Sequence, residues 1–152
     1  MGIEFEHVSK RYPDGTVAVD DFSLTVPTGR FTVLVGSSGS GKTTLLRMVS
    51  RMVTPTAGRV LIDDEDIAGT DPVKLRRRIG YVMQNSGLLP HRRVLDNIAT
   101  VPRLNGVGRR EAQSRALDLM DLVGLDRSMA RRWPEQLSGG QQQRVGVARA
   151  LA

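Results

Sequence analysis

The chain contains no cysteine among its 152 residues. Disulfide bonds and thiolate metal sites are therefore excluded, which fits a reducing compartment such as the cytosol. Aromatic residues make up only 4% of the sequence, so the core has to be built from aliphatic side chains. No stretch approaches the roughly 18 consecutive apolar residues that a membrane-spanning helix requires. These absences predict a cytoplasmic protein with an aliphatic core.

Targeting signals are also lacking at the amino terminus. The chain opens on the alternating, strand-like run Ile3–Val8 instead of a basic segment followed by an apolar stretch. Met1 and Gly2 would allow myristoylation, but Glu6 stands where that motif needs Ser or Thr. We expect neither a signal peptide nor a lipid anchor.

Acidic residues are outnumbered, 16 against 22 Lys and Arg, which gives a net charge of +6. A basic surface of this kind suits nucleic acid as a partner. However, no aromatic residues are interleaved with the arginines to stack on bases, and no nucleic-acid-binding motif is present. We expect a solvated basic face, or one that faces anionic lipid and a membrane partner. The basic runs are Arg76–Arg78, Arg92–Arg93, Arg109–Arg110 and Arg131–Arg132.

The most informative segment lies between an apolar, strand-like run at residues 31–35 and a helical pattern at residues 44–49. It reads Gly-Ser-Ser-Gly-Ser-Gly-Lys-Thr and spans residues 36–43. This motif in a strand–loop–helix context is typical of a P-loop, which binds nucleoside triphosphates. A flexible Gly/Ser linker before a helix is the alternative, but Lys and Thr in register after a buried-type strand favour the P-loop.

Each residue type in this segment has a chemical role in binding phosphate or Mg²⁺. Glycines let backbone N–H groups converge on phosphate oxygens, and the amino end of the following helix adds its positive dipole end. Lys42 would neutralise phosphate charge and act in catalysis, and the Thr43 hydroxyl would hold Mg²⁺. The predicted ATP-binding residues here are Gly36, Ser37, Ser38, Gly39, Ser40, Gly41, Lys42, Thr43 and Thr44.

The first half of the chain reads as strands with a few helices. Period-2 or apolar patterns predict strands at residues 3–8, 22–26, 31–35, 60–62 and 79–83. Residues 12–15, with Pro and Gly, form a turn signal. Asp71 and Pro72 are the capping and first residues of a predicted short helix. These patterns predict an α/β core.

From about residue 88 the pattern becomes helical. Val94, Ile98 and Val101 share one helix face, and a second helix is predicted over residues 112–123, with Gly124 as its C-terminal cap. A last helix begins near Ser138. We therefore divide the chain into a nucleotide-binding core at residues 1–87 and a helical subdomain at residues 88–152 that ends in this helix.

A second constellation lies at the start of the last helix. Ser138 and Gln141 have the S-x-x-Q spacing of a capping box, which is the plain structural explanation. That explanation does not account for Gly139 and Gly140, because each glycine in the first turn weakens a helix by up to about 1 kcal/mol. Bare N–H groups at a helix start make a phosphate site. We therefore expect Ser138–Gln141 to meet a second nucleotide, held by another subunit.

Taken together, residues 36–43, Gln84 and residues 137–141 resemble the Walker A motif, the Q-loop and the LSGGQ signature of ATP-binding cassette (ABC) ATPases. The resemblance implies an incomplete P-loop NTPase core with an antiparallel β region and an α-helical subdomain. It also implies ATP and Mg²⁺ as cofactors, and a homodimer that closes around two ATP molecules.

The resemblance assigns further roles by position. Tyr12 resembles the aromatic residue that stacks on adenine, although a half-buried turn tyrosine is the plain alternative. Gln84 resembles the Q-loop glutamine, a catalytic residue that contacts Mg²⁺ and the attacking water. Ser138 and Gly140 would reach the γ-phosphate bound by the opposite subunit. Nothing marks His7 or His91 as catalytic.

A narrower resemblance points to quaternary-amine osmoprotectant importers. It is carried by residues 55–58, 61–67, 79–85, 87–91, 97–102 and 141–152, and the same segments also resemble those of amino-acid importers. Asp64 stands where the family usually has glycine. The implied partners are a membrane permease and, indirectly, an extracytoplasmic solute-binding protein, with the subunit peripheral on the inner face of the cell membrane. The transported solute is chosen by other chains.

Asp63 is a competing candidate, since residues 60–63 form an apolar strand that ends in Asp, as a Walker B strand does. Its position soon after the P-loop helix favours a solvated turn instead. Residues 1–152 then hold no Walker B strand, catalytic glutamate or switch histidine. We therefore expect a truncated ABC domain that binds nucleotide weakly and hydrolyses it negligibly by itself.

Two other functions stay open at this point. One is a non-transport ABC ATPase that acts in translation or DNA repair. The other is a non-hydrolysing nucleotide-binding fragment that regulates or competes for partners.

Overall fold

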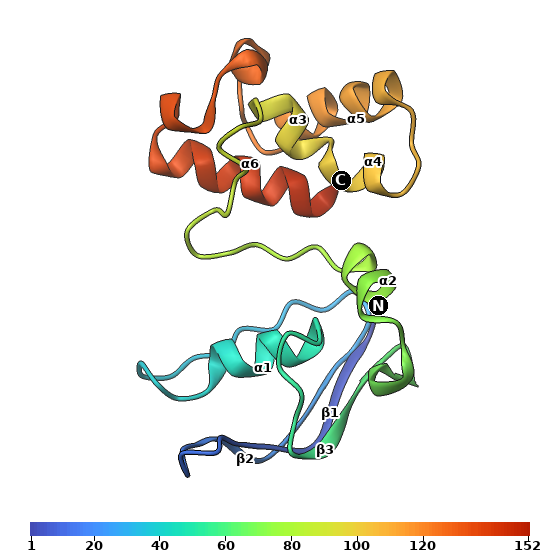
Figure 1. The fold of residues 1–152 in the computed structure, drawn as a ribbon, viewed down its shortest axis with the longest axis vertical. Coiled ribbons are helices and arrows are strands. Elements are labelled where there is room, and N and C mark those ends of the chain that lie inside the picture. Colours follow the sequence, from blue (N-terminus) through green and yellow to red (C-terminus); the bar gives the residue numbers. More distant parts are fainter. The chain divides into compact units, whose positions relative to one another are not determined.

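The computed structural model describes residues 1–152, which divide into two compact units at residues 1–76 and 77–152 (Figure 1). The functional division at residue 87, into a core and a helical subdomain, stays a prediction. The mixed α/β fold with a separate helical part agrees with the expectation from sequence. None of the helices is both long and apolar enough to cross a bilayer.

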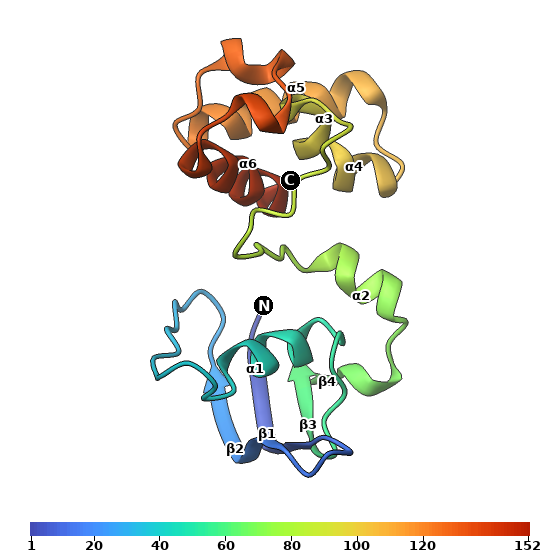
Figure 2. The ribbon, with the colours of Figure 1, turned by 60° about the vertical axis from the view of Figure 1, so that its left-hand side comes forward.

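Unit 1 is built on a four-stranded sheet with the order β2-β1-β3-β4 (Figure 2). Its strands are β1 (Ile3–Arg11), β2 (Val17–Val26), β3 (Ala57–Ile62) and β4 (Glu65–Asp66). All three pairings are antiparallel, which confirms the predicted antiparallel β region. Buried Phe5 on β1 meets the ring of Phe22 edge-on, with the centroids 5.6 Å apart.

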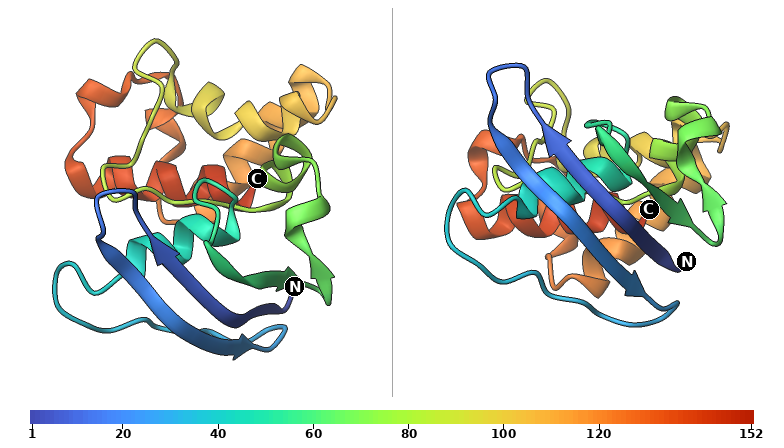
Figure 3. Two further views of the ribbon diagram at one scale, coloured as in Figure 1. Left: turned by 60° about the horizontal axis from the view of Figure 1, so that its bottom comes forward. Right: turned by 90° about the horizontal axis from the view of Figure 1, so that it is seen from below.

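Helix α1 (Lys42–Val49) lies against one face of this sheet (Figures 2 and 3). Its buried residues are Leu45, Met48 and Val49, at i, i+3 and i+4, so the helical pattern predicted for residues 44–49 is confirmed and has one buried face. The chain then passes through β3, β4 and a short 3₁₀ helix, Ile67–Gly69, to α2 (Pro72–Arg78). The Asp71 carboxylate accepts bonds from the amides of Val73 and Lys74, as expected for a cap.

Two of the predicted strands do not form. Residues 31–35 and 79–83 adopt no regular secondary structure. Phe31 and Val35 are 92% and 90% exposed, although their residue types are typical of a buried strand. A strand needs a hydrogen-bonded neighbour on at least one side, and no strand of the four-stranded sheet pairs with either segment. The prediction was therefore wrong because apolar pattern alone supplies no pairing partner.

Unit 2 is helical, with α3 (Val94–Ile98), α4 (Thr100–Leu104), α5 (Arg109–Leu122) and α6 (Gly139–Leu151). Two 3₁₀ helices, Arg127–Arg131 and Pro134–Gln136, lie between α5 and α6. The single face predicted for Val94 to Val101 is split at Ala99. Pro102 has no amide to bond the carbonyl of Ile98, and its ring crowds that carbonyl. Gly124, with φ of 68°, ends α5 in the left-handed conformation, as predicted.

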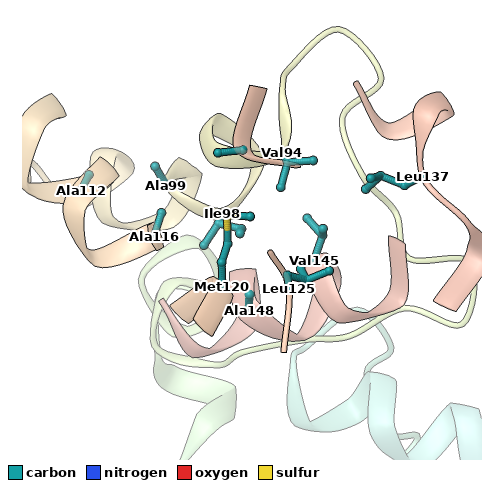
Figure 4. Close-up of a cluster of buried hydrophobic side chains, with 11 residues drawn as sticks. Val94, Ile98, Ala99, Ala112, Ala116, Met120, Leu125, Leu137, Val145 and Ala148 are labelled. Atoms are coloured by element: carbon teal, nitrogen blue, oxygen red, sulfur yellow. The ribbon is translucent and has the colours of Figure 1, made fainter. Parts of the chain in front are cut away.

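The core of unit 2 is aliphatic, as the scarcity of aromatics requires (Figure 4). Buried Asn97 is, with Ser86, one of two polar residues buried in unit 2. Its Oδ1 accepts from the Leu89 amide at 2.8 Å, while its Nδ2 donates to the carbonyls of Leu89 and Arg92. This side chain therefore replaces backbone partners for the loop before α3. The core consists of Val94, Ile98, Ala99, Ala112, Ala116, Met120, Leu125, Ala130, Leu137, Val145 and Ala148.

The hairpin between β3 and β4 has a two-residue turn with Asp63 at φ of 50° and Asp64 at φ of 65°. Positive φ at both central positions is the type I′ turn, which favours glycine at the second position. Asp64 departs from that preference, yet the turn forms. The carboxylate of Asp63 also accepts a bond from the Gly2 amide at 2.8 Å.

Replacing Asp64 with glycine removes a strained left-handed side chain. We expect Asp64→Gly to raise the free energy of unfolding by about 0.5 kcal/mol, because relief of roughly 1 kcal/mol of strain exceeds the added chain entropy. Asp64→Ala is the matched control and should lower it, since alanine keeps the Cβ and loses the polar group. Urea unfolding measures the free energy of unfolding of both variants. Equal effects of the two variants would contradict the proposal that the Asp64 backbone is strained.

Candidate nucleotide-binding site

The loop before α1 has the backbone that a phosphate cradle needs. Gly39 and Gly41 have φ of 83° and 84°, a region that side chains rarely adopt. A Cβ on Gly41 would lie 2.3 Å from the carbonyl oxygen of Ala18 on β2. Glycine is therefore required at residue 41 for the amino end of α1 to lie against the sheet.

Lys42 is folded back over this loop. Its Nζ donates to the carbonyl oxygens of Gly36 and Ser37, at 2.8 and 2.6 Å, and to Oγ of Ser40 at 3.0 Å. No acidic side chain is paired with this ammonium group. A positive charge held only by neutral groups, beside a helix amino end, is suited to an anion.

The loop is open to solvent along its length. A Cβ added to Gly39 would meet nothing within 4 Å, and residues 36–40 are all exposed. By contrast, a Cβ on Gly36 would lie 2.7 Å from Oγ of Ser40, so the loop closes on itself there. The residues present thus match a triphosphate tail: glycine-rich backbone, one lysine, and hydroxyls at Thr43 and Thr44 in the first turn of α1.

Tyr12 lies at the turn of the β1–β2 hairpin. Its amide donates to the Thr16 carbonyl at 2.9 Å, and its carbonyl accepts from the Gly15 amide at 2.9 Å. The Lys10 ammonium lies 5.3 Å from the ring centroid, in a cation–π contact. The residue as a whole is 38% exposed. Its role as an adenine-stacking residue stays a prediction.

Gln84 lies in unit 2, in the irregular segment that precedes α3. Its side chain is exposed, and the turn that contains it is closed by a bond from the Ser86 amide to the Met83 carbonyl at 3.1 Å. Exposure leaves the carboxamide available to a ligand. Its catalytic and metal-binding roles stay predictions.

The start of α6 has both features expected from its sequence. Ser138 Oγ accepts from the Gln141 amide at 3.3 Å, and Gln141 Oε1 accepts from the Ser138 amide at 2.9 Å, which completes the capping box. Gly139 and Gly140 are exposed, and a Cβ on either would meet nothing within 4 Å. No packing inside the chain therefore requires these glycines.

The predicted residues fall into two groups, one in each unit. Residues 36–44 and Tyr12 belong to unit 1, while Gln84 and residues 138–141 belong to unit 2. Asp63 also lies in unit 1, in the β3–β4 turn. Its acidic neighbours, residues 64–66, do not gather with it into a metal-ligating cluster. His7 is bonded to Asp21 at an exposed irregularity of β1, outside both groups.

Sequence reasoning missed two residues, Arg149 and Gln142, that hold the Gln84 segment. Half-buried Arg149 donates to the carbonyls of Ser86 and Gly87, at 3.1 and 2.9 Å, and Gln142 Oε1 accepts from Ser86 Oγ at 3.4 Å. Burial lowers the pKa of the Arg149 guanidinium by desolvating its charge. The spacing of residues 142, 146 and 149 on one helix face was the available signal.

The comparisons with known proteins agree with this geometry. Residues 19–152 match the family model for ABC transporters. The carnitine transport ATP-binding protein OpuCA of Listeria monocytogenes is 49% identical over 150 residues, which cover 99% of this chain and 38% of that protein. The glycine betaine uptake system ATP-binding protein YehX of Escherichia coli is also 49% identical, over 99% of this chain and 48% of its own length.

A solved structure gives the same result at the level of the fold. The dimeric ATP-binding cassette MJ0796, in a post-hydrolysis state bound to ADP and Pi, superposes with a TM-score of 0.91 and 35% identity. The match covers 99% of this chain and 69% of that one. The chain thus spans less than half the length of the two curated relatives, and it belongs to the ABC transporter family.

Proposed function

We propose that the protein containing this chain is the ATP-binding subunit of an ABC importer, an ATPase that couples ATP binding and hydrolysis to uptake of a small solute. The observation that carries this proposal is the loop at residues 36–41, with the uncompensated charge of Lys42 inside it. The exposed, glycine-containing start of α6 supports it independently, because such a start has no role in packing.

The residues of each group take distinct roles in this proposal. The amides of residues 36–44 and the Lys42 ammonium bind the phosphates, and the Tyr12 ring stacks on the base. The Thr43 hydroxyl and the Gln84 carboxamide bind Mg²⁺, which would neutralise phosphate charge during hydrolysis. Ser138, Gly139, Gly140 and Gln141 bind the γ-phosphate of an ATP held by a second subunit.

The partners follow from these roles. A signature that binds a nucleotide held by another subunit requires a dimer, and the similar cassette MJ0796 is dimeric. A membrane permease would receive the motion of the closing dimer and would place the subunit on the inner face of the cell membrane. A solute-binding protein would act through the permease. Nucleic acid has no part in this proposal.

The solute is proposed from the relatives. OpuCA of Listeria monocytogenes is a carnitine transport protein and YehX of Escherichia coli a glycine betaine uptake protein. Both solutes are quaternary amines, so an osmoprotectant of this class is the first choice and an amino acid the second. Co-purification with a permease tests import, whereas co-purification with ribosomes or DNA would indicate a non-transport ABC ATPase.

Lys42→Ala tests the phosphate cradle. We expect at least about tenfold weaker Mg·ATP binding, because a hydrogen bond from a charged group contributes about 1.5–3 kcal/mol. Asp63→Asn is the matched control and should leave binding unchanged. Titration of a fluorescent ATP analogue into the protein that contains this chain measures both. Equal binding by wild type and Lys42→Ala would refute the proposed function.

Gly140→Ala separates stability from function. The added Cβ meets no atom within 4 Å, so helix propensity predicts a free energy of unfolding higher by up to about 1 kcal/mol. The same methyl group would block the approach of a phosphate to the helix start, so we expect ATP hydrolysis to fall strongly. Denaturant unfolding and phosphate release measure the two effects. A variant that is both more stable and fully active would show that the start of α6 does not contact the nucleotide.

A further inference from the structure

The irregular segment at residues 79–88 runs alongside α6 within unit 2, as the views of Figures 1 and 3 agree. Small residues allow this close approach. A Cβ on Gly80 would lie 2.2 Å from the carbonyl oxygen of Ala150, and a Cβ on Gly146 would lie 3.3 Å from that of Ser86. At these two positions the backbone of the segment that presents Gln84 therefore lies directly against the helix.

Polar contacts then fix the segment to the helix. Arg149 donates to two successive carbonyls, of Ser86 and Gly87, through its two terminal nitrogens. Ser86 is buried, and both Ser86 and Gly87 have φ of 53°. A left-handed serine is strained by about 1–3 kcal/mol and persists only where its surroundings hold it. The Arg149 fork supplies that restraint, because its planar geometry matches two neighbouring acceptors.

Gln142 extends the connection to the start of α6. Its Oε1 accepts from the Ser86 hydroxyl at 3.4 Å. Its Nε2 donates to the carbonyls of Pro134 and Leu137, at 3.0 and 3.3 Å. Leu137 directly precedes the capping residue Ser138. A single carboxamide thus contacts both the Gln84 segment and the turn that carries the signature.

We infer that Ser86, Gln142 and Arg149 are positioning residues that make the Gln84 segment and the signature turn move together. This inference rests on the proposed function, in which Gln84 acts at the nucleotide of its own subunit and Ser138–Gln141 act at the nucleotide of the opposite one. A rigid connection between them joins the two ATP sites of the dimer. Binding of one ATP then favours the arrangement that receives the second.

The test is the ATP dependence of hydrolysis in the assembled dimeric protein. For the wild type we expect a Hill coefficient between about 1.5 and 2, the limit for two sites. Ser86→Ala removes only one hydroxyl. Arg149→Lys replaces the planar guanidinium, which donates to two carbonyls, with a single ammonium group. We expect the coefficient to fall toward 1 in each variant and further in the double variant, while the affinity of one site for a fluorescent ATP analogue stays unchanged.

Arg144→Lys is the matched control. Arg144 lies on the same helix, but it donates to the Gly124 carbonyl at the end of α5, away from the Gln84 segment. This variant should keep the wild-type Hill coefficient. Thermal unfolding of all variants separates coupling from damage, because a merely structural role would lower the melting temperature and leave the coefficient unchanged.

The outcomes distinguish this inference from the function on which it rests. No ATP binding by the wild type would end both. ATP binding with a wild-type Hill coefficient of 1, or equal cooperativity in wild type, Ser86→Ala and Arg149→Lys, would overturn the coupling and leave the ATPase assignment intact. Lower cooperativity in the two variants but not in Arg144→Lys would support it.

Discussion

The close approach of the loop at Gly41 to β2 is the constraint on which the nucleotide site depends. Residue 41 has a left-handed backbone and no room for a Cβ, because the Ala18 carbonyl lies 2.3 Å from the place where that atom would be. This contact sets the amino end of α1 against the sheet. The loop before it is left exposed, and Lys42 has only neutral partners. The phosphate cradle is thus a consequence of backbone packing as much as of charge.

A comparable use of small residues recurs in unit 2. Gly80 and Gly146 allow a segment without regular secondary structure to lie on α6, and Arg149 and Gln142 then satisfy its carbonyl and hydroxyl groups. The two exposed glycines at the start of α6 differ from these, because nothing inside the chain approaches them. Glycine therefore allows close internal packing at Gly80 and Gly146, whereas no internal contact requires it at Gly139 and Gly140.

Much of the fold was predictable from local signals. The three longer strands of the sheet, the capping of α2 by Asp71, the capping box of α6 and the end of α5 at Gly124 were all confirmed. The caps and the end of α5 depend on contacts within a few residues, which a sequence pattern records directly, and the three strands have alternating or apolar patterns and found pairing partners in the sheet. The strands expected at residues 31–35 and 79–83 failed, since strand pairing joins residues far apart and no local pattern specifies the partner. The break at Ala99 could have been foreseen from Pro102.

The sequence by itself determined the family and predicted the phosphate-binding loop and the signature, because the order and spacing of those residues are specific to their chemistry. It also favoured a turn at Asp63. Only the tertiary structure decided that Lys42 bonds its own loop, that Asp63 accepts a bond from the Gly2 amide, and that Arg149 and Gln142 hold the Gln84 segment. The physical reason is the range of the interactions. Motif chemistry is carried by neighbours in the chain, whereas these bonds join positions whose proximity exists only after the chain has packed.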